Sequence, residues 1–441
     1  MPGYFFPVVV HGSSCWLRAQ TSVVVMNKTA AFFELSLRFW YGGSLRHSRN
    51  VTPFIGNHRR GNVMKISVIG GGHGCYAAAI EMVEKGFDVT LWRRDKSALD
   101  ALRQSGYLGV KDIQGERRIA VGQGEDQLSL TSDLAEAVEH ATLLIVPLPA
   151  TTHESLAEQL GPLFHDDQVV FLSPGTFGCY LFHRGMCQAG NQSRVAFCET
   201  GTLPYLARKH GSDNVVISVY ATRLPTGVLP NELSNHAFSV LRKAYPSVEP
   251  IEDSLSGALM NAGPIIHPPL IMMNAGPLEY FDVWDIHNEG TQPSIRRVTT
   301  ALDKERIALR KVLGYGPAHF PLSNHYTTEG EEWMYGRGAH SKLTDSGDWR
   351  EKIALDSHRY MLEDTRLGLS LIVSVGRWLG QPTPVAEGLL NIASAITGRD
   401  LYAEGRTFER LGLDGLSRES MSDLLAHGIQ GGARSGDEHG T

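Results

Sequence analysis

The chain lacks any apolar run of the roughly 20 residues needed to span a bilayer, so the sequence predicts no integral membrane protein. Cysteine is also scarce. The 441 residues contain only Cys15, Cys75, Cys179, Cys187 and Cys198, with no CxxC pair among them. This argues against a zinc site and a disulfide framework, predicts no bound metal, and is typical of a reducing cytoplasm. An excess of positive charge is missing too, since 41 Lys and Arg face 47 Asp and Glu, so we expect no nucleic-acid partner.

Hydrophobic residues at 42% and charged residues at 20% are ordinary for a soluble globular protein, and the length predicts two or three domains. Positive charge is concentrated in residues 1–63, where seven Lys and Arg accompany a single acid, Glu34. This stretch carries a net charge of +6 and shows no sustained helical or strand period. We favour an extension, mis-assigned or disordered, that precedes a native start at Met64. A basic, acid-poor transit peptide is the alternative.

A nucleotide-binding unit opens directly after Met64. Lys65–Ile69 predicts a strand, Cys75–Gly86 a helix and Phe87–Trp92 a second strand, with a glycine-rich turn between the first two elements. In the Rossmann motif such a turn lets the backbone approach a pyrophosphate at the helix N-terminus. The third glycine position holds Cys75, which is small enough for close helix–strand packing. The predicted cofactor contacts here are Gly70, Gly72, His73, Gly74 and Cys75.

The end of the second predicted strand bears on cofactor choice. Arginine there accommodates the 2′-phosphate of NADP, whereas an acid favours NAD. The sequence reads Arg93-Arg94-Asp95, so we expect NADP or NAD, with NADP favoured, and the arginines could also be solvated surface charges. Pro147 follows a later predicted strand at the sheet edge that normally meets the nicotinamide, and we assign it to the cofactor. His153, just beyond, could face the cofactor or simply begin a helix.

The remaining pattern divides the chain in two. Further strands are predicted at 141–146, 168–172 and 215–220, with a helix at 153–163, which favours a doubly wound parallel sheet covered on both faces. After about residue 255 amphipathic helices take over, at 294–313, 349–378 and 383–397. The predicted organisation is a Rossmann domain over residues 64–250, a mostly α-helical domain over 251–427 and a disordered tail over 428–441.

His267 lies in the apolar stretch Asn261–Gly276, where a histidine is more often a core residue than a catalyst. Its neighbours, Pro268-Pro269 and the flanking Asn274, suit a plain core helix poorly. The HisPro with its following AsnAlaGly resembles the second domain of the opine dehydrogenases, the octopine and nopaline dehydrogenase family. Further matching segments lie downstream in the same order: Thr291–Ser294, Ala301–Arg306, His358–Asp364, Gly368–Leu369, Gly380–Pro384 and Glu404–Thr407.

This resemblance, which spans about Met64 to Leu413, implies roles for individual residues. It implies that His267 is an acid–base group oriented by Asp364, and that Arg359 binds a substrate carboxylate. A carboxylate on the far ring nitrogen would set the tautomer of such a histidine, and a guanidinium can grip a carboxylate with two parallel hydrogen bonds. Asp364 and Arg359 could instead form an ion pair on a helix surface. Asn261 and Thr202 fall in segments that resemble the substrate crevice.

The family reductively condenses an amino acid with a 2-oxo acid such as pyruvate, or oxidises the product, and we expect the same reaction here. Relatives often carry an arginine directly after a ProGly turn, whereas this chain has Thr176 after Pro174-Gly175. The substrate or cofactor contact that such an arginine makes is therefore in doubt here. Two alternatives stay open: a glycerol-3-phosphate dehydrogenase or ketopantoate reductase, which typically rely on a lysine, and a non-catalytic NADP-binding redox sensor. A cytoplasmic protein, with a homodimer as one option, completes the expectation.

Overall fold

The computed structural model describes residues 63–345, 347 and 350–430, and the predictions for 1–62 and 431–441 lie outside this range. Its core is a 12-stranded sheet in the order β12-β11-β8-β7-β6-β1-β2-β5-β4-β3-β10-β9. The strands are β1 (Lys65–Ile69), β2 (Asp88–Trp92), β3 (Tyr107–Asp112), β4 (Gly115–Val121), β5 (Gln127–Thr131), β6 (Leu143–Val146), β7 (Val169–Leu172), β8 (Ala196–Thr200), β9 (Tyr205–His210), β10 (Asn214–Tyr220), β11 (Leu224–Leu229) and β12 (Val248–Pro250).

The centre of the sheet is parallel, as the sequence predicts, and its strands run in the order β5-β2-β1-β6-β7-β8. Three antiparallel pairs, β3–β4, β9–β10 and β8–β11, extend it, so the whole sheet is mixed. The strand order reverses between β1 and β6. In such sheets ligands bind outside the carboxyl ends of the strands at this switch point, which here places Gly70 beside Pro147 and Leu148.

Both faces of the sheet are covered because its inner strands are apolar throughout. All four residues of β6 are buried, and alternate ones point to opposite faces. Leu143 and Ile145 pack with α2 (His73–Glu84) and α7 (Ser234–Ala244), whereas Leu144 and Val146 pack with α4 (Leu134–Glu139), α5 (His153–Leu160) and α6 (Gly178–Gln188). Each such side chain contributes about 1.5–3 kcal/mol by burial, which fixes the register of the sheet.

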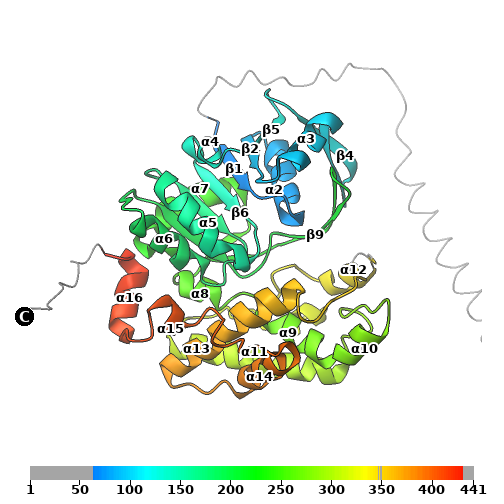
Figure 1. Ribbon diagram of the computed structural model, residues 1–441, viewed down its shortest axis with the longest axis vertical. Helices are drawn as coiled ribbons and strands as arrows, with labels where there is room; N and C mark the ends of the chain where they lie inside the picture. The colour runs from blue at the N-terminus through cyan, green and yellow to red at the C-terminus, as the bar shows by residue number, and fades with distance from the viewer. Residues whose placement is uncertain (1–62, 346, 348–349, 431–441) are drawn as a thin grey trace, which may run out of the picture. The chain divides into compact units, whose positions relative to one another are not determined.

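The helical half follows β12, and the predicted boundary between residues 250 and 251 lies just before its first helix (Figure 1). The helices not yet named are α3 (Lys96–Ser105), α8 (Ser254–Ala258), α9 (Gly263–Met273), α10 (Ala275–Tyr280), α11 (Pro293–Val312), α12 (Ala339–Asp345), α13 (Ser370–Leu379), α14 (Pro384–Thr397), α15 (Phe408–Leu411) and α16 (Arg418–His427), with short 3₁₀ turns η1 (Ala150–Thr152), η2 (Gly161–Leu163), η3 (Asn231–Leu233) and η4 (Leu322–Tyr326). A π-helix, η5, spans Tyr360–Leu369 and leads directly into α13.

Two glycines let α9 and η5 pack unusually closely. A side-chain carbon at Gly263 would lie 2.1 Å from the Asp364 carboxylate, and one at Gly368 would lie 2.2 Å from the ring of Pro264. Pro268 and Pro269 sit inside α9 without breaking it. The close contact brings the middle of α9 onto the first half of η5, where His267 and Asp364 meet.

One predicted helix is wrong in part. The sequence predicts a helix over Trp349–Trp378, but residues 350–358 are not helical. Ile353 and Leu355 are buried while Lys352 and Ala354 are exposed, and this alternation is that of an extended segment. Regular structure begins only with η5.

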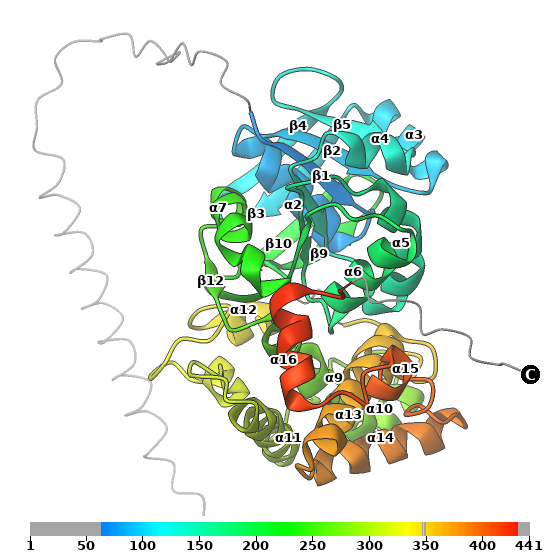
Figure 2. The ribbon, with the colours of Figure 1, turned by 90° about the vertical axis from the view of Figure 1, so that its left-hand side faces the viewer.

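The C-terminal end of the described chain returns to the sheet half. Figure 2 shows α16, in red, running back toward the sheet half, and it contacts β11 and the turn η3. Gly428 ends this helix, and the Ile429 amide donates a hydrogen bond of 2.8 Å to Nε2 of His183 on α6. The first residues of the predicted tail therefore have a defined position. Across the ranges that the structure covers, no helix is both long and apolar enough to cross a membrane.

Candidate active site

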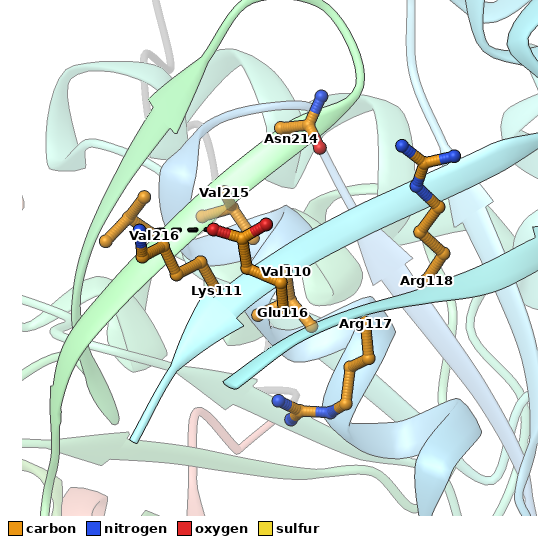
Figure 3. Close-up of a pocket in the computed structure, with 8 residues that line it drawn as sticks. All are labelled: Val110, Lys111, Glu116, Arg117, Arg118, Asn214, Val215 and Val216. Carbon is orange, nitrogen blue, oxygen red and sulfur yellow. Dashed lines mark ion pairs between the residues drawn. The ribbon is translucent and has the colours of Figure 1, made fainter. Parts of the chain in front are cut away.

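A cavity of about 450 Å³ lies where the carboxyl ends of β1, β6 and β7 face α9 and η5. It is lined by most of the predicted site residues: Gly72, His73, Gly74, Pro147, Thr202, Asn261, His267, Arg359 and Asp364. A second hollow, of about 590 Å³, lies along β3, β4 and β10 and includes an ion pair between Lys111 and Glu116 (Figure 3). None of the predicted residues lines it, so the first cavity is the candidate site.

The glycine-rich turn forms one wall of this cavity. Gly70 has φ +119°, which an L side chain rarely adopts, and a side-chain carbon there would lie 2.5 Å from Leu148. Gly72 has open space where a side chain would be, and Gly74 packs against Pro147 and Leu203. The backbone thus approaches the cavity with nothing in front of the first amides of α2. At a helix N-terminus such amides donate hydrogen bonds to a phosphate.

Cys75 fills the third glycine position as a buried packing residue. Its thiol donates to the Ile69 carbonyl at 3.6 Å, and burial raises the pKa of Cys75 to about 12. The side chain is therefore an unreactive thiol on the inner side of the turn. Its contribution to a nucleotide site is space for close packing, not chemistry.

His73 faces the cavity from the first turn of α2. The Lys209 amide donates 2.7 Å to its Nδ1, so the ring carries its proton on Nε2. Burial, with help from Arg208 and Arg359, lowers the pKa of His73 to about 4. A neutral ring with one N–H directed away from β9 can donate a hydrogen bond to an anionic ligand.

The arginines after β2 are placed very differently. Arg93 lies against the glycine turn, donating to the Tyr76 hydroxyl at 3.2 Å, and a side-chain carbon at Gly71 would touch it. Arg94 is exposed and makes no hydrogen bond or ion pair with any residue that the structure describes. Asp95 caps α3, accepting from Ser97 at 2.7 Å and the Ala98 amide at 3.2 Å, so its carboxylate already has partners.

Lys209 is a basic residue at this turn that the sequence does not reveal. Its ammonium lies 4.2 Å above the Tyr76 ring and 3.5 Å from the Gly71 carbonyl. Burial and the neighbouring Arg93 lower the pKa of Lys209. Lys209 reaches the turn from β9, and no local pattern links that strand to residues 70–76.

The opposite wall centres on His267. Its Nδ1 lies 2.7 Å from Oδ2 of Asp364, and its ring stacks on Tyr360 with centroids 3.8 Å apart. Burial, with the nearby Arg359, lowers the pKa of His267 well below 6.5, and burial raises the pKa of Asp364 to about 7. The pair therefore takes up or releases one proton near neutral pH, which suits general acid–base chemistry.

The π-helix η5 sets the groups around this pair. Glu363 and Asp364 within its wider turns line the cavity, together with Arg359 just before its first residue. The Arg359 guanidinium is 46% exposed, lies 4.9 Å over the Tyr360 ring and has a loose contact of 3.9 Å with Glu363. Glu363 accepts a hydrogen bond from the Ala150 amide at 2.8 Å, which ties the loop after β6 to the helical half. Burial and then Asp364 raise the pKa of Glu363 to about 7.

Asn261 and Thr202 line the cavity with their polar atoms engaged. Asn261 donates to the Thr176 hydroxyl at 2.8 Å and accepts from the Gly263 amide at 3.0 Å. Thr202 donates to the Tyr335 hydroxyl at 2.6 Å. Through these hydrogen bonds both residues fix the positions of neighbouring groups in the cavity wall.

Thr176 belongs to a turn that is held from both sides. Thr176 and Phe177 both have left-handed backbones, with φ of 52° and 60°. The buried Glu199 accepts from the Phe177 amide at 3.0 Å, and the buried Arg406 donates to the Thr176 carbonyl at 2.8 Å. His153, in contrast, is buried at the start of α5, 3.1 Å from the Leu148 carbonyl, and does not line the cavity.

Known proteins match both halves of the chain. Residues 250–397 match the family described as NAD/NADP octopine/nopaline dehydrogenase, alpha-helical domain. Residues 65–178 match NAD-dependent glycerol-3-phosphate dehydrogenase N-terminus. An opine dehydrogenase of Arthrobacter sp. (strain 1C) is 27% identical over 81% of this chain and 98% of its own length. Protein ocs of Agrobacterium tumefaciens (strain Ach5) is 22% identical over 82% and 99%.

The chain is therefore similar to opine dehydrogenases over most of its length, and residues 250–397 match the helical domain of that family. Members of this family are oxidoreductases that act on the CH–NH group of donors and use NAD or NADP. Glycerol-3-phosphate dehydrogenases match far less; that of Thermoanaerobacter sp. (strain X514) covers 22% of this chain and 27% of its own length. The likeness to those enzymes is confined to the nucleotide half.

Solved structures of opine dehydrogenases share the fold. Octopine dehydrogenase in complex with NADH and agmatine aligns with a TM-score of 0.61 at 17% identity, covering 84% of this chain and all of that one. Yersinopine dehydrogenase with NADP+ bound aligns with a TM-score of 0.54 at 14% identity, covering 83% and 98%. The predicted fold class, a Rossmann domain followed by a mostly helical domain, is confirmed.

Proposed function

We propose that this protein joins the amino group of an amino acid to a 2-oxo acid and reduces the resulting imine. The amine attacks the oxo carbon, water leaves, and a hydride with a proton converts the C=N bond to a secondary amine carrying two carboxylates. NAD(P)H supplies the hydride, and in the reverse direction NAD(P)+ receives it. The single observation that carries the proposal is the His267–Asp364 pair at 2.7 Å in one cavity with the glycine turn and Arg359.

The cavity suits a nicotinamide nucleotide at its sheet wall. The open space at Gly72 and the first amides of α2 fit a pyrophosphate, with Gly70 allowing the turn. Ser173, just after β7, lines the same cavity, and its buried hydroxyl has no hydrogen-bond partner. A buried polar atom without a partner is costly, so a polar group of the cofactor can satisfy it.

His267 acts in this proposal as the acid–base group. Asp364 holds its Nδ1, which leaves Nε2 for the substrate. Because the pair exchanges one proton near neutral pH, His267 can give a proton as water leaves the carbinolamine and take it back in the reverse reaction. Tyr360, stacked on the ring, prevents the imidazole from turning away.

Arg359 serves as the carboxylate clamp. Its guanidinium is exposed to the cavity and only loosely paired, so it can form two parallel hydrogen bonds to a substrate carboxylate. His267 and Arg359 flank Tyr360, which sets the reacting carbon near the acid–base group. Asn261 and Thr202 position the walls through Thr176 and Tyr335.

The rival dehydrogenases find less support in this cavity. Glycerol-3-phosphate dehydrogenase and ketopantoate reductase typically rely on a lysine, and among the cavity residues that the structure describes there is none. A nucleotide sensor would need no buried acid–base pair in the second domain. The charged groups assembled here instead match the chemistry of imine formation.

The test is a screen of amino acids against pyruvate and other 2-oxo acids, with NADPH and NADH in parallel. We expect cofactor oxidation that needs both the amino acid and the oxo acid. Oxidation with dihydroxyacetone phosphate or ketopantoate alone would contradict the proposal, as would cofactor binding without turnover on any pair.

A further inference from the structure

One wall of the cavity is built almost entirely from rings. The wall, termed here the aromatic wall, comes from η4, the segment before α12, and α12 itself, at the level where the sheet half meets the helical half (Figures 1 and 2). It consists of His325, Tyr326, Trp333, His340 and Leu343. None of these residues has a part in the acid–base or nucleotide chemistry above.

The rings pack against one another and leave their outer surface to the cavity. His325 lies 4.7 Å from Trp333 and 5.4 Å from His340, centroid to centroid, and Tyr326 lies 4.9 Å from His340. The Trp333 indole is tied to the Phe320 carbonyl at 3.1 Å. The aromatic wall is therefore a preformed surface, and a ligand side chain meets it without much rearrangement.

The histidines of this wall are uncharged at neutral pH. Burial, with His340 and Arg296 nearby, lowers the pKa of His325 to about 3, and burial lowers that of His340. His325 has one buried ring nitrogen, Nδ1, without a partner. The aromatic wall thus offers flat ring surface without a charge at neutral pH.

Two of the three acids that line the described cavity are fully engaged, whereas the second oxygen of Glu363 has only the 3.9 Å contact with Arg359. Glu351 pairs with Arg208 at 2.8 Å, Glu363 accepts from the Ala150 amide, and Asp364 holds His267. Arg208 and Arg359 add positive charge to the same space. Glu351 balances the charge of Arg208, so a guanidinium or ammonium on a substrate side chain would have to share Glu363 with Arg359.

We propose that the aromatic wall receives the side chain of the amino-acid substrate and selects neutral aromatic side chains over cationic ones. This inference rests on the proposed function. Edge and face contacts between rings favour an aromatic side chain over a small one, beyond the area that each buries. A cationic side chain would lose its hydration and would gain only a carboxylate that Arg359 already contacts. At Tyr326 a cation–π contact is already made by Arg296, which lies 4.5 Å over that ring.

The experiment compares phenylalanine, tyrosine, leucine, alanine, lysine and arginine at saturating 2-oxo acid and cofactor. We expect kcat/KM for phenylalanine to exceed that for arginine by roughly 100-fold and that for alanine by roughly 10-fold. The kcat/KM for tyrosine should stay within a few-fold of that for phenylalanine, because His325 can form a hydrogen bond with the tyrosine hydroxyl. A kcat/KM for arginine or alanine that equals or exceeds that for phenylalanine would overturn the inference.

A thermal-shift titration with the cofactor present separates this failure from failure of the proposed function. Should no pair turn over, the proposed function fails. The inference about the aromatic wall is then supported if phenylalanine raises Tm more than arginine does at equal concentration. It is contradicted if phenylalanine does not.

A charge placed on the wall gives an independent test. Leu343→Glu adds a carboxylate to the aromatic wall, whereas Lys342→Glu places one on the same helix outside the cavity. We expect L343E to lower the phenylalanine-to-arginine ratio of kcat/KM by at least about 10-fold, because the carboxylate supplies an unshared partner for the cation. K342E should leave the ratio unchanged. An unchanged ratio in L343E that folds with wild-type Tm would contradict the inference.

Discussion

The two halves of the molecule meet at one cavity and contribute to it by different means. The sheet half presents mainly backbone: a turn with Gly70 at φ +119° and the open amides of α2 beyond it. The helical half presents side chains, with His267 on α9, Asp364 on η5 and Arg359 just before η5. Backbone amides suit a ligand common to many dehydrogenases, and side chains suit one particular reaction.

This contrast predicts that binding and chemistry can be separated by mutation. Changes in the helical half should remove turnover and leave the nucleotide site intact. Changes near the glycine turn should alter cofactor affinity and leave the acid–base pair intact. The contacts between the halves include the hydrogen bond from the Ala150 amide to Glu363.

The largest expected effect is that of His267→Ala. Loss of the acid–base group should lower kcat by roughly 100-fold or more, because a positioned acid–base group contributes that much. The Kd for NADPH, measured by fluorescence titration, should stay within twofold. His140→Ala, an exposed histidine of the sheet half, is the matched control. Near-normal turnover in H267A would contradict the assignment of the chemistry to the helical half.

Asp364→Asn should come next and should also change the pH profile. In the reductive direction the pair must hold its proton, so wild-type kcat should fall as pH rises through about 7, and the oxidative rate should rise over the same range. The neighbouring Glu363 and Arg359 contribute to this titration in both proteins. In D364N we expect roughly 100-fold lower kcat. Retention of the wild-type profile would place the titrating group elsewhere.

Arg359→Ala should act on substrate affinity more than on turnover. Removing a bidentate partner of a carboxylate should raise KM for one substrate by about 10- to 100-fold. Arg359→Lys should recover only part of the loss, since an ammonium cannot form the parallel pair. Steady-state kinetics with each substrate varied in turn identifies which carboxylate Arg359 holds. An unchanged KM for both would remove it from the site.

The smallest expected effect concerns the cofactor. Arg93→Ser should raise the Kd for NADPH by about 10-fold and change the Kd for NADH little, because a guanidinium at this point favours a 2′-phosphate. Arg94→Ser, at an exposed side chain without contacts in the described structure, should change both affinities little. Equal effects of R93S on the two cofactors would show that Arg93 does not discriminate between them.

Much of the sheet half is readable from local sequence. The predicted strand Lys65–Ile69 coincides with β1, because a buried parallel strand reads as a short apolar run next to its glycine turn. Lys209 could not be foreseen at that turn. It arrives on β9, whose position depends on pairing with β10 more than on any pattern near residue 70.

In the helical half, by contrast, local sequence predicts little of the site. The resemblance to the family paired His267 with Asp364, 97 residues apart, and periodicity alone could not have done so. The π-helix η5 was not predicted, because an apolar pattern of ten residues does not distinguish it from an α-helix. The aromatic wall was missed as well, since its members come from three short segments that only the tertiary fold brings together.

The most direct test of the central claim is the identity of the product formed from an accepted amino acid, pyruvate and NAD(P)H deuterated at the transferable position. We predict one secondary amine per cofactor oxidised, with the mass of both substrates less one water plus one deuterium and one hydrogen. Mass spectrometry and NMR should locate the deuterium on the former oxo carbon. A deuterated 2-hydroxy acid beside unchanged amino acid would contradict the account.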